Sequence, residues 1–163
     1  MAVTEGYEAP DFSLPTDGGG TLTLSELRGR IVALYVYPQD DTQSCTNEAL
    51  SFNALLADFA TVNAVVIGLS PDTVQRHDRF KAKYGLALTL VADEHRRAIE
   101  AYGLWVEKQM YGRRYMGVER STFLIDESGR IARMWSKVKV KGHAETVLAA
   151  ARELAGRSAT PAA

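Results

Sequence analysis

The sequence predicts an α/β protein with a central mixed sheet and helices on both faces. Residues 31–37 and 64–69 are nearly uninterrupted apolar runs, as expected of buried strands, and each is followed by a segment with helical spacing. Two later strand patterns, joined by a short turn, precede a final amphipathic segment. Strand–helix–strand–helix followed by a hairpin and a helix is typical of a mixed sheet between helical layers.

The first half of the chain adds a hairpin and a helix to this pattern. Residues 11–14 and 21–24 alternate between apolar and polar and flank a glycine triplet, which predicts an N-terminal hairpin. The triplet is not expected to bind phosphate, because neither a lysine nor a helix start follows it. After the strand at 31–37, apolar residues at helical spacing predict a helix that begins near residues 42–44 and continues to about residue 59.

The second half continues the alternation of strands and helices. Ser70-Pro71-Asp72 supplies a cap, a proline and an acid for a helix that stops at Gly85. The later elements are expected as a strand at 89–92, a short helix at 95–102, a hairpin of strands at 121–125 and 131–136, and a last helix at about 142–155. Residues 1–156 are therefore expected to form a single domain, and the small, polar residues 157–163 a disordered tail.

Composition and charge exclude several classes of protein. The 163 residues are 46% apolar and 24% charged, which is ordinary for a globular domain. The net charge of −1 gives no reason to expect nucleic acid or an anionic membrane as a partner. No apolar stretch could span a bilayer, and the first residues lack the basic and apolar regions of a secretory signal. With one unpaired thiol, these features indicate the cytoplasm.

The single cysteine, Cys45, falls in the first turn of the helix expected after the strand at 31–37. One cysteine cannot form an internal disulfide, and the three histidines lack metal-ligand spacing, so neither a metal site nor a cofactor is expected. A helix N-terminus stabilises a thiolate, but by only ~0.3–1 kcal/mol, whereas ionising an ordinary thiol fully at neutral pH requires about 3.4 kcal/mol. The carboxylates of Asp40 and Asp41 oppose it further. A nearby cation is therefore required.

Cys45 ends the motif Pro38-x-x-x-Thr42-x-x-Cys45. This motif resembles the active-site motif of the peroxiredoxins, and the longer run 37–48 is similar to the peroxiredoxin Q branch, also called bacterioferritin comigratory protein. A second segment, Gly-Val-Glu-Arg-Ser-Thr-Phe-Leu-Ile-Asp at 117–126, is similar to the family segment that supplies a catalytic arginine, here Arg120. The resemblance extends from about residue 8 to the final helix and implies a thioredoxin-like fold with an N-terminal hairpin.

The resemblance implies a thiol-dependent peroxidase that reduces hydrogen peroxide and organic hydroperoxides through a Cys45 sulfenic acid. Arg120 is the expected cation, because its fixed fork of donors could hold the sulfur anion and a peroxide oxygen together. Thr42 is expected to place its hydroxyl near both and also to cap the helix. Donors aimed at the charge that develops in the transition state would supply the rest of the acceleration.

Three further residues are expected to support the pocket. Pro38 would shield the thiolate from water, and the backbone N–H of Ser44 would add a donor. Glu48 is expected to support the site as a first-turn acid rather than to donate a proton.

The chain departs from the family pattern at the resolving cysteine. Many peroxiredoxin Q proteins carry one five residues after the peroxidatic cysteine, where this chain has Leu50, and others carry it near 80–83, where this chain has none. The sulfenic acid must then be reduced by an outside thiol, which could be thioredoxin, glutaredoxin or a low-molecular-weight thiol. Until that happens it is open to further oxidation by a second peroxide.

Two other functions stay open at this point. In a peroxide sensor, Cys45 would oxidise without efficient turnover, and the missing resolving cysteine favours this alternative. In a thioredoxin-like interaction or holdase protein the thiol would be incidental, which the matched Thr42, Cys45 and Arg120 disfavour. The expected partners are a peroxide and an external thiol donor, with no nucleic acid and no membrane, and the expected state is a monomer or weak homodimer.

Overall fold

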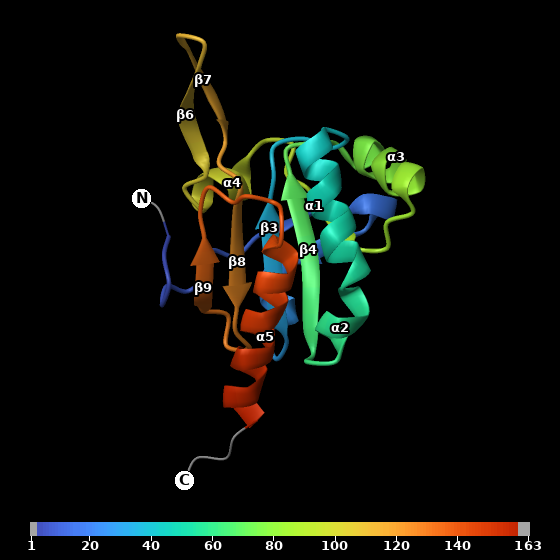
Figure 1. Ribbon diagram of the computed structural model, residues 1–163, viewed down its shortest axis with the longest axis vertical. Coiled ribbons are helices and arrows are strands. Elements are labelled where there is room, and N and C mark those ends of the chain that lie inside the picture. The colour runs from blue at the N-terminus through green and yellow to red at the C-terminus, as the bar shows by residue number, and fades with distance from the viewer. Residues whose placement is uncertain (1–2, 160–163) are drawn as a thin grey trace.

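A five-stranded sheet forms the centre of the computed structural model, which describes residues 3–159 (Figure 1). The strand order is β5-β4-β3-β8-β9, with β3, β4 and β5 parallel to one another and β8 antiparallel to both β3 and β9. The strands span Ile31–Val36 (β3), Ala64–Ser70 (β4), Thr89–Ala92 (β5), Ser121–Ile125 (β8) and Ile131–Trp135 (β9). The predicted mixed sheet is confirmed.

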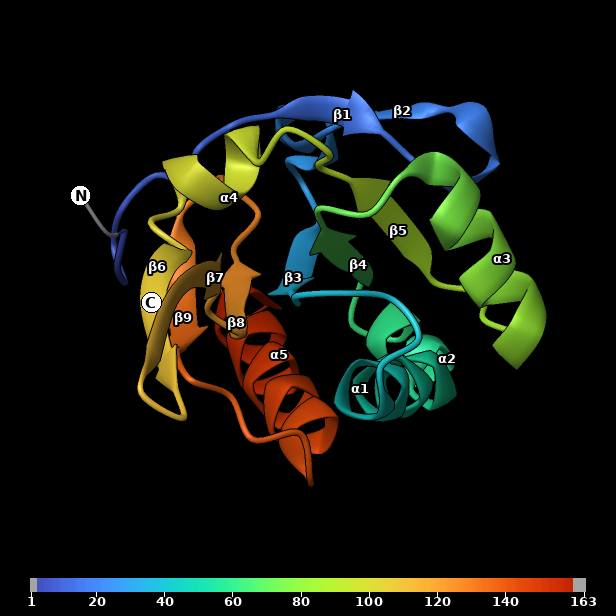
Figure 2. The same ribbon diagram turned by 90° about the horizontal axis from the view of Figure 1, so that it is seen from above.

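The central strand β3 separates two hydrophobic cores, because its buried side chains alternate between the two faces of the sheet. Ala33 and Tyr35 pack on one face under α1 (Gln43–Ala54), α2 (Leu56–Ala60) and α5 (His143–Ala159). Val32 and Leu34 pack on the other, under the N-terminal segment and α4 (Arg97–Ala101) (Figure 2). The predicted α/β architecture with helices on both faces is therefore confirmed.

The N-terminal hairpin is also present, as β1 (Ser13–Pro15) and β2 (Thr21–Thr23), which pair antiparallel. The glycine triplet is part of its turn, which includes the 3-10 segment η1 (Asp17–Gly19) and precedes a second, η2 (Leu24–Leu27), after β2. An ion pair of 2.7 Å between Asp17 and Lys81 joins this turn to α3 (Val74–Tyr84). That helix lies beside β5 (Figure 2) and ends where predicted, since Gly85 adopts the left-handed conformation of a C-cap.

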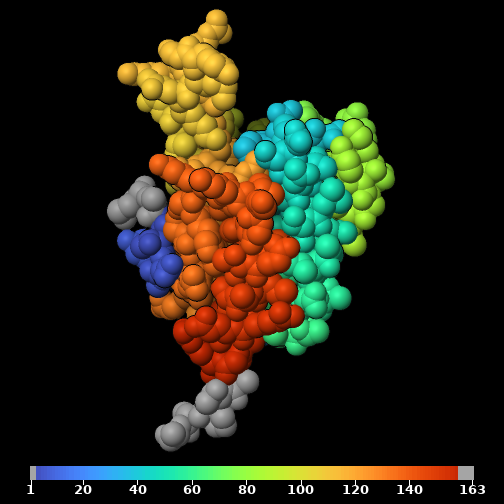
Figure 3. Space-filling view, in the orientation of Figure 1, coloured from blue at the N-terminus to red at the C-terminus, as the bar shows by residue number. Residues whose placement is uncertain are grey.

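A second hairpin, absent from the expected elements, projects away from the body of the molecule (Figures 1 and 3). It consists of β6 (Trp105–Met110) and β7 (Arg113–Val118), joined by a turn in which Tyr111 and Gly112 have positive φ. Because most of its side chains are exposed, its sequence lacks the apolar alternation of a half-buried strand. Its second strand ends two residues before Arg120.

The C-terminal helix is longer than expected. The disordered tail expected at 157–163 is wrong for residues 157–159, because α5 continues to Ala159. An ion pair of 2.6 Å between Glu153 and Arg157, one helical turn apart, supports this extension beyond the apolar face. Residues 160–163 of the expected tail lie outside the described residues. Within the described part of the chain, no helix is long and apolar enough to cross a membrane.

Candidate active site

Cys45 lies in the first turn of α1, directly beyond the carboxyl end of β3. Its side chain faces the core and is 1% exposed. The first helical hydrogen bond runs from the N–H of Thr46 to the carbonyl of Thr42, at 2.8 Å. The backbone N–H groups of the preceding turn therefore point out of the helix end, where they favour negative charge.

The structure brings Arg120 to Cys45 across 75 residues of sequence. The register of β8 on β3 explains this, because Ser121, the first residue of β8, pairs with Val36, the last residue of β3. Arg120 Nη2 lies 3.2 Å from Cys45 Sγ, and Nη1 lies 2.5 Å from Glu48 Oε1. The guanidinium thus divides its fork of donors between a sulfur and a carboxylate.

Glu48 lies one turn after Cys45 on the same side of α1 and is 1% exposed. The expected first-turn position is wrong, because the helix begins at Gln43 and its first turn holds no acid. Burial raises the pKa of Glu48 to about 7, although the Arg120 charge and hydrogen bond act to lower it. Its second oxygen, Oε2, is buried and has no hydrogen-bond partner within residues 3–159. Glu48 therefore contacts the site through Arg120.

Two buried groups near Arg120 and Cys45, the side chains of His143 and Tyr35, hold no charge at neutral pH. Burial, and then the positive charge of Arg120, lower the pKa of His143 to about 4, and its Nε2 lies 2.8 Å from the Thr122 hydroxyl. Burial raises the pKa of Tyr35 well above its usual value. Burial also opposes the charge on Arg120, but Glu48 and Cys45 outweigh it and raise the Arg120 pKa. Arg120 is therefore the cation of this site.

Thr42 occupies the N-cap position of α1, but it does not cap the helix through its side chain. Its hydroxyl instead donates to the carbonyl of Gln39, at 3.3 Å, in the preceding turn. The expected cap is therefore wrong, because the hydroxyl that would accept from the helix points back to the loop. The consequence is a helix N-terminus whose donors are not used by a cap.

The two acids expected to oppose the thiolate both have partners of their own. Asp40 is buried and contacts the Tyr37 hydroxyl and His77. Asp41 lies on the surface, where hydrogen bonds from Lys83 and then Tyr84 lower its pKa. The carboxyl group of each is therefore engaged with partners other than the sulfur.

The other expected pocket residues lie at the same helix start. Pro38 follows β3 and is half-buried, and Ser44 is exposed in the first turn of α1. Leu50 is 41% exposed. No sequence pattern marked Tyr35 or His143 as part of this site, because both pack among aromatic side chains of the core. The site combines a buried thiol, a guanidinium at hydrogen-bond distance and free helix donors, an arrangement suited to nucleophilic attack that releases an anionic oxygen.

Comparison with known proteins agrees with this geometry. The model of the AhpC/TSA family matches residues 6–134. The chain belongs to the AhpC/TSA family. It is similar to peroxiredoxin Bcp of Bacillus subtilis, with 42% identity over 94% of this chain and 98% of the relative. It is also similar to peroxiredoxin Bcp of Xanthomonas campestris, with 45% identity over 86% of this chain and 88% of the relative.

A solved structure supports the same placement within this peroxiredoxin family. Peroxiredoxin Q of Xanthomonas campestris superposes with a TM-score of 0.86 at 41% identity, over 95% of this chain and 98% of that chain. Together with the Bcp relatives, it places this peroxiredoxin in the Q branch and confirms the thioredoxin-like fold.

Proposed function

We propose that this chain is a thiol-dependent peroxidase that reduces hydrogen peroxide and organic hydroperoxides with Cys45 as the nucleophile. The Cys45 thiolate attacks one peroxide oxygen, the O–O bond breaks, and the departing oxygen leaves as hydroxide or alkoxide and takes up a proton. Cys45 becomes a sulfenic acid. A first external thiol then forms a mixed disulfide and releases water, and a second thiol restores the Cys45 thiol and leaves as the external disulfide.

The contact between Arg120 and Cys45 carries this proposal. A guanidinium 3.2 Å from the sulfur stabilises the thiolate that a helix N-terminus alone would not sustain. The same fork, anchored by Glu48, lies where charge develops on the departing oxygen. Relatives support the reaction class, since a solved structure of the Xanthomonas campestris bacterioferritin comigratory protein, at 40% identity, concerns its alkyl peroxide reduction activity.

The reductant in this proposal comes from outside the chain, because Cys45 is its only cysteine. Thioredoxin, glutaredoxin and a low-molecular-weight thiol are the candidate donors. We further propose that a single domain of residues 1–156 carries the activity, in the cytoplasm, as a monomer or weak homodimer.

Steady-state peroxide consumption with each donor system tests the proposal. The wild-type protein should consume many equivalents of peroxide when thiol is in excess. When thiol is absent it should consume about one equivalent per chain to form the sulfenic acid, and no more than about three if that acid is oxidised further. Cys45→Ser should consume none under either condition. Equal consumption by wild type and Cys45→Ser would show that the thiol is incidental.

A peroxide sensor remains the second candidate, favoured by the lone, 1% exposed thiol. A sensor would oxidise at Cys45 as fast as a peroxidase but would be reduced slowly by every donor. Rapid oxidation without turnover across thioredoxin, glutaredoxin and glutathione systems would therefore favour the sensor over the enzyme.

A further inference from the structure

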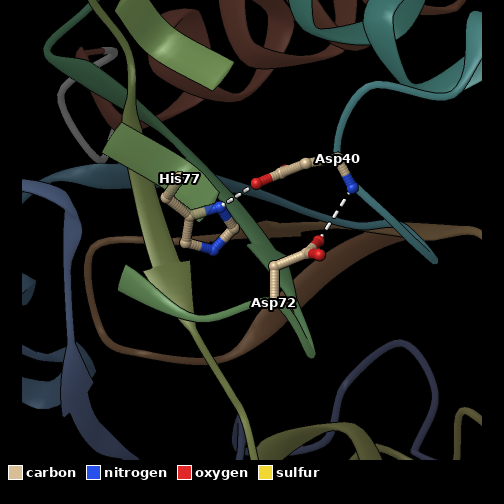
Figure 4. A group of neighbouring side chains, drawn as sticks. All are labelled: Asp40, Asp72 and His77. Atoms are coloured by element: carbon tan, nitrogen blue, oxygen red, sulfur yellow. Dashed lines mark hydrogen bonds and ion pairs between the residues drawn. The ribbon is translucent and has the colours of Figure 1, made fainter. Parts of the chain in front are cut away.

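Three buried polar side chains, which are not part of the contact between Arg120 and Cys45, lie close together beside the loop that leads into α1. Figure 4 shows them. Asp40 comes from this loop, His77 from α3, and Asp72 from the segment just before α3. The Asp40 carboxyl accepts from the Tyr37 hydroxyl at 2.5 Å and lies 2.7 Å from His77 Nδ1. The Asp40 N–H donates to Asp72 Oδ2 at 2.8 Å.

These groups already satisfy one another. Their ligand atoms lie within 4.8 Å, a spacing that a metal ion could bridge. However, His77 Nδ1 faces Asp40, and Asp72 Oδ2 accepts both from the Asp40 N–H and from the Ser70 hydroxyl at 2.7 Å. Buried polar groups with complete hydrogen bonding stabilise one arrangement of the chain. The hydrogen bonds of this cluster therefore explain its presence without a metal ion, because they join the loop before α1 to α3 and to the segment before it.

The pairing of His77 and Asp40 involves a proton shared between them. His77 Nε2 lies 3.0 Å from the Val91 carbonyl, which can only accept, so Nε2 carries a hydrogen. Nδ1 faces an Asp40 carboxyl whose other oxygen accepts from Tyr37. One more proton must lie between Nδ1 and the carboxyl, on one partner or the other. Both distributions give a buried hydrogen bond that joins the loop to α3 and, through Val91, to β5.

This hydrogen bond bears on access to Cys45. Asp40 is two residues before the N-cap Thr42, so the loop and the first turn of α1 are continuous. A small peroxide needs little space, whereas an external thiol must bring its sulfur within bonding distance of Cys45 Sγ. Because Cys45 is 1% exposed, the first turn must move before that contact can form. Because Asp40 anchors the residues just before that turn to α3, its hydrogen bond with His77 restrains such movement.

We propose that Asp40 and His77 are positioning residues whose hydrogen bond holds the loop closed over Cys45 and limits how often an external thiol reaches the oxidised sulfur. This rests on the proposed function, in which reduction comes from outside. The closed form keeps Arg120 on the sulfur for the reaction with peroxide, and the open form admits the thiol. Because the closed form predominates, weakening the hydrogen bond multiplies the open population and barely depletes the closed one.

Asp40→Ala is the main test, with two rate measurements on the full chain. Alkylation of reduced Cys45 by iodoacetamide and reduction of its sulfenic acid by dithiothreitol should both become roughly ten-fold faster, as expected for the loss of one buried hydrogen bond. The rate constant with hydrogen peroxide should stay within about two-fold of wild type. Asp40→Asn should restore wild-type rates, because its amide can donate to Nδ1 while its oxygen accepts from Tyr37.

Two controls separate this effect from general destabilisation. Lys83→Met removes the neighbouring link to the same loop, a 2.8 Å pair with Asp41 that is exposed and therefore weak, and should leave both rates unchanged. Val147→Ala creates a cavity in α5 and lowers the Tm of the whole fold. If Asp40→Ala fails to fold, Tyr37→Phe removes only one hydroxyl from the cluster and should give the same changes at smaller size.

The comparison of rates decides the proposal. Alkylation in Asp40→Ala or Tyr37→Phe that exceeds that of Val147→Ala, after both are matched for the loss in Tm, supports it. Alkylation no faster than in Val147→Ala, or Asp40→Asn as fast as Asp40→Ala, would overturn it. Alkylation needs no peroxide turnover, so this result is independent of whether the chain proves to be a peroxidase.

Discussion

Two strand–helix junctions, β3–α1 and β4–α3, lie at the carboxyl ends of neighbouring parallel strands. They have the same order of elements, but their helices are capped differently. Each helix follows a buried parallel strand and has a threonine at its N-cap. In α3 the Thr73 hydroxyl accepts a hydrogen bond of 3.2 Å from the N–H of Arg76. In α1 the Thr42 hydroxyl turns away and donates to Gln39. The α3 N-terminus therefore has a side-chain cap, which makes β4–α3 the closed junction, and the α1 N-terminus has none, which makes β3–α1 the open junction.

The difference shows how a common structural junction becomes a reactive one. Helix N-terminal donors that no cap uses are available to an anion, whether a thiolate or a peroxide oxygen. The open junction also receives a cation from a distant strand, since Arg120 reaches Cys45. At the closed junction the basic partner, Arg76, is local and pairs at 3.1 Å with Asp72. Departure from local capping rules therefore coincides with the candidate active site.

Among the substitutions that test this comparison, replacement of Arg120 should cause the largest loss of peroxide reactivity. Arg120→Met removes the donor shared by the sulfur and the developing oxyanion, and we expect the rate constant for Cys45 with hydrogen peroxide to fall roughly 10²- to 10³-fold. Arg120→Lys keeps the charge but loses the planar fork, so it should recover only part of the rate. Stopped-flow oxidation of Cys45 measures both variants.

The matched control is Arg76→Met, which removes the cation of the closed junction. Arg76 is half-exposed and its ion pair contributes little, so peroxide reactivity should stay within about two-fold of wild type. Similar losses in Arg76→Met and Arg120→Met would mean that the two junctions do not differ in function.

The acids that pair with the two arginines, Glu48 with Arg120 and Asp72 with Arg76, differ as well. Glu48→Gln should reveal how much burial of the Glu48 carboxyl lowers the stability of the fold. Burial raises the pKa of Glu48 from 4.5 to about 7, so between these values the folded protein holds a proton that the unfolded chain has released. Glu48 therefore stabilises the fold fully below pH 4.5, and this contribution is lost as the pH rises to 7. Chemical denaturation should show the stability of Glu48→Gln, relative to wild type, rising by up to about 3 kcal/mol over that range.

The pH dependence due to Glu48 must be read from the difference in stability between the variant and the wild type, because His143 changes the stability of both proteins with pH in the opposite direction. Its pKa is lowered from 6.5 to about 4, so its contribution is lost as the pH falls through that window. Glu145→Gln, at an exposed position in the first turn of α5, is the control and should show no such change. A pH-independent difference for Glu48→Gln would mean that this carboxyl is ionised throughout.

The sequence predicted the strand and the helix at each junction because these depend on local patterns. The expected cap of the second helix, Ser70, is wrong, because β4 runs to Ser70 and Thr73 is the N-cap of α3. Apolar runs mark β3 and β4, Gly85 marks the end of α3 through its left-handed conformation, and Cys45 falls in a helical first turn for reasons contained in its own neighbourhood. The local pattern did not indicate, however, whether the hydroxyl of an N-cap threonine would accept a hydrogen bond from its own helix. Thr42 follows Asp41, whose φ is +62°, and nothing in the local pattern predicts that turn.

Long-range contacts were beyond local patterns. Arg120 was proposed from a family resemblance, and its position on Cys45 depends on the register of β8 against β3. The pairing of Asp40 with His77 likewise joins residues 37 positions apart. The β6–β7 hairpin was missed for a different reason, since its exposed strands carry no pattern of burial to detect.

The same substitution at both N-caps should give the smallest but most direct test of the comparison. Thr73→Val removes a working cap, so it should lower the free energy of unfolding by ~1 kcal/mol and leave the peroxide rate constant unchanged. Thr42→Val removes a hydroxyl that caps nothing and bonds only to the Gln39 carbonyl, so it should change stability little. If the same hydroxyl binds the incoming peroxide, as the family resemblance implies, the peroxide rate constant should fall roughly ten-fold, the effect of losing that one hydrogen bond to the substrate. Urea denaturation and stopped-flow oxidation measure the two quantities on each variant. If Thr42→Val lost as much stability as Thr73→Val, the Thr42 hydroxyl would be capping α1 in solution, and the open helix end would not explain the reactivity of Cys45.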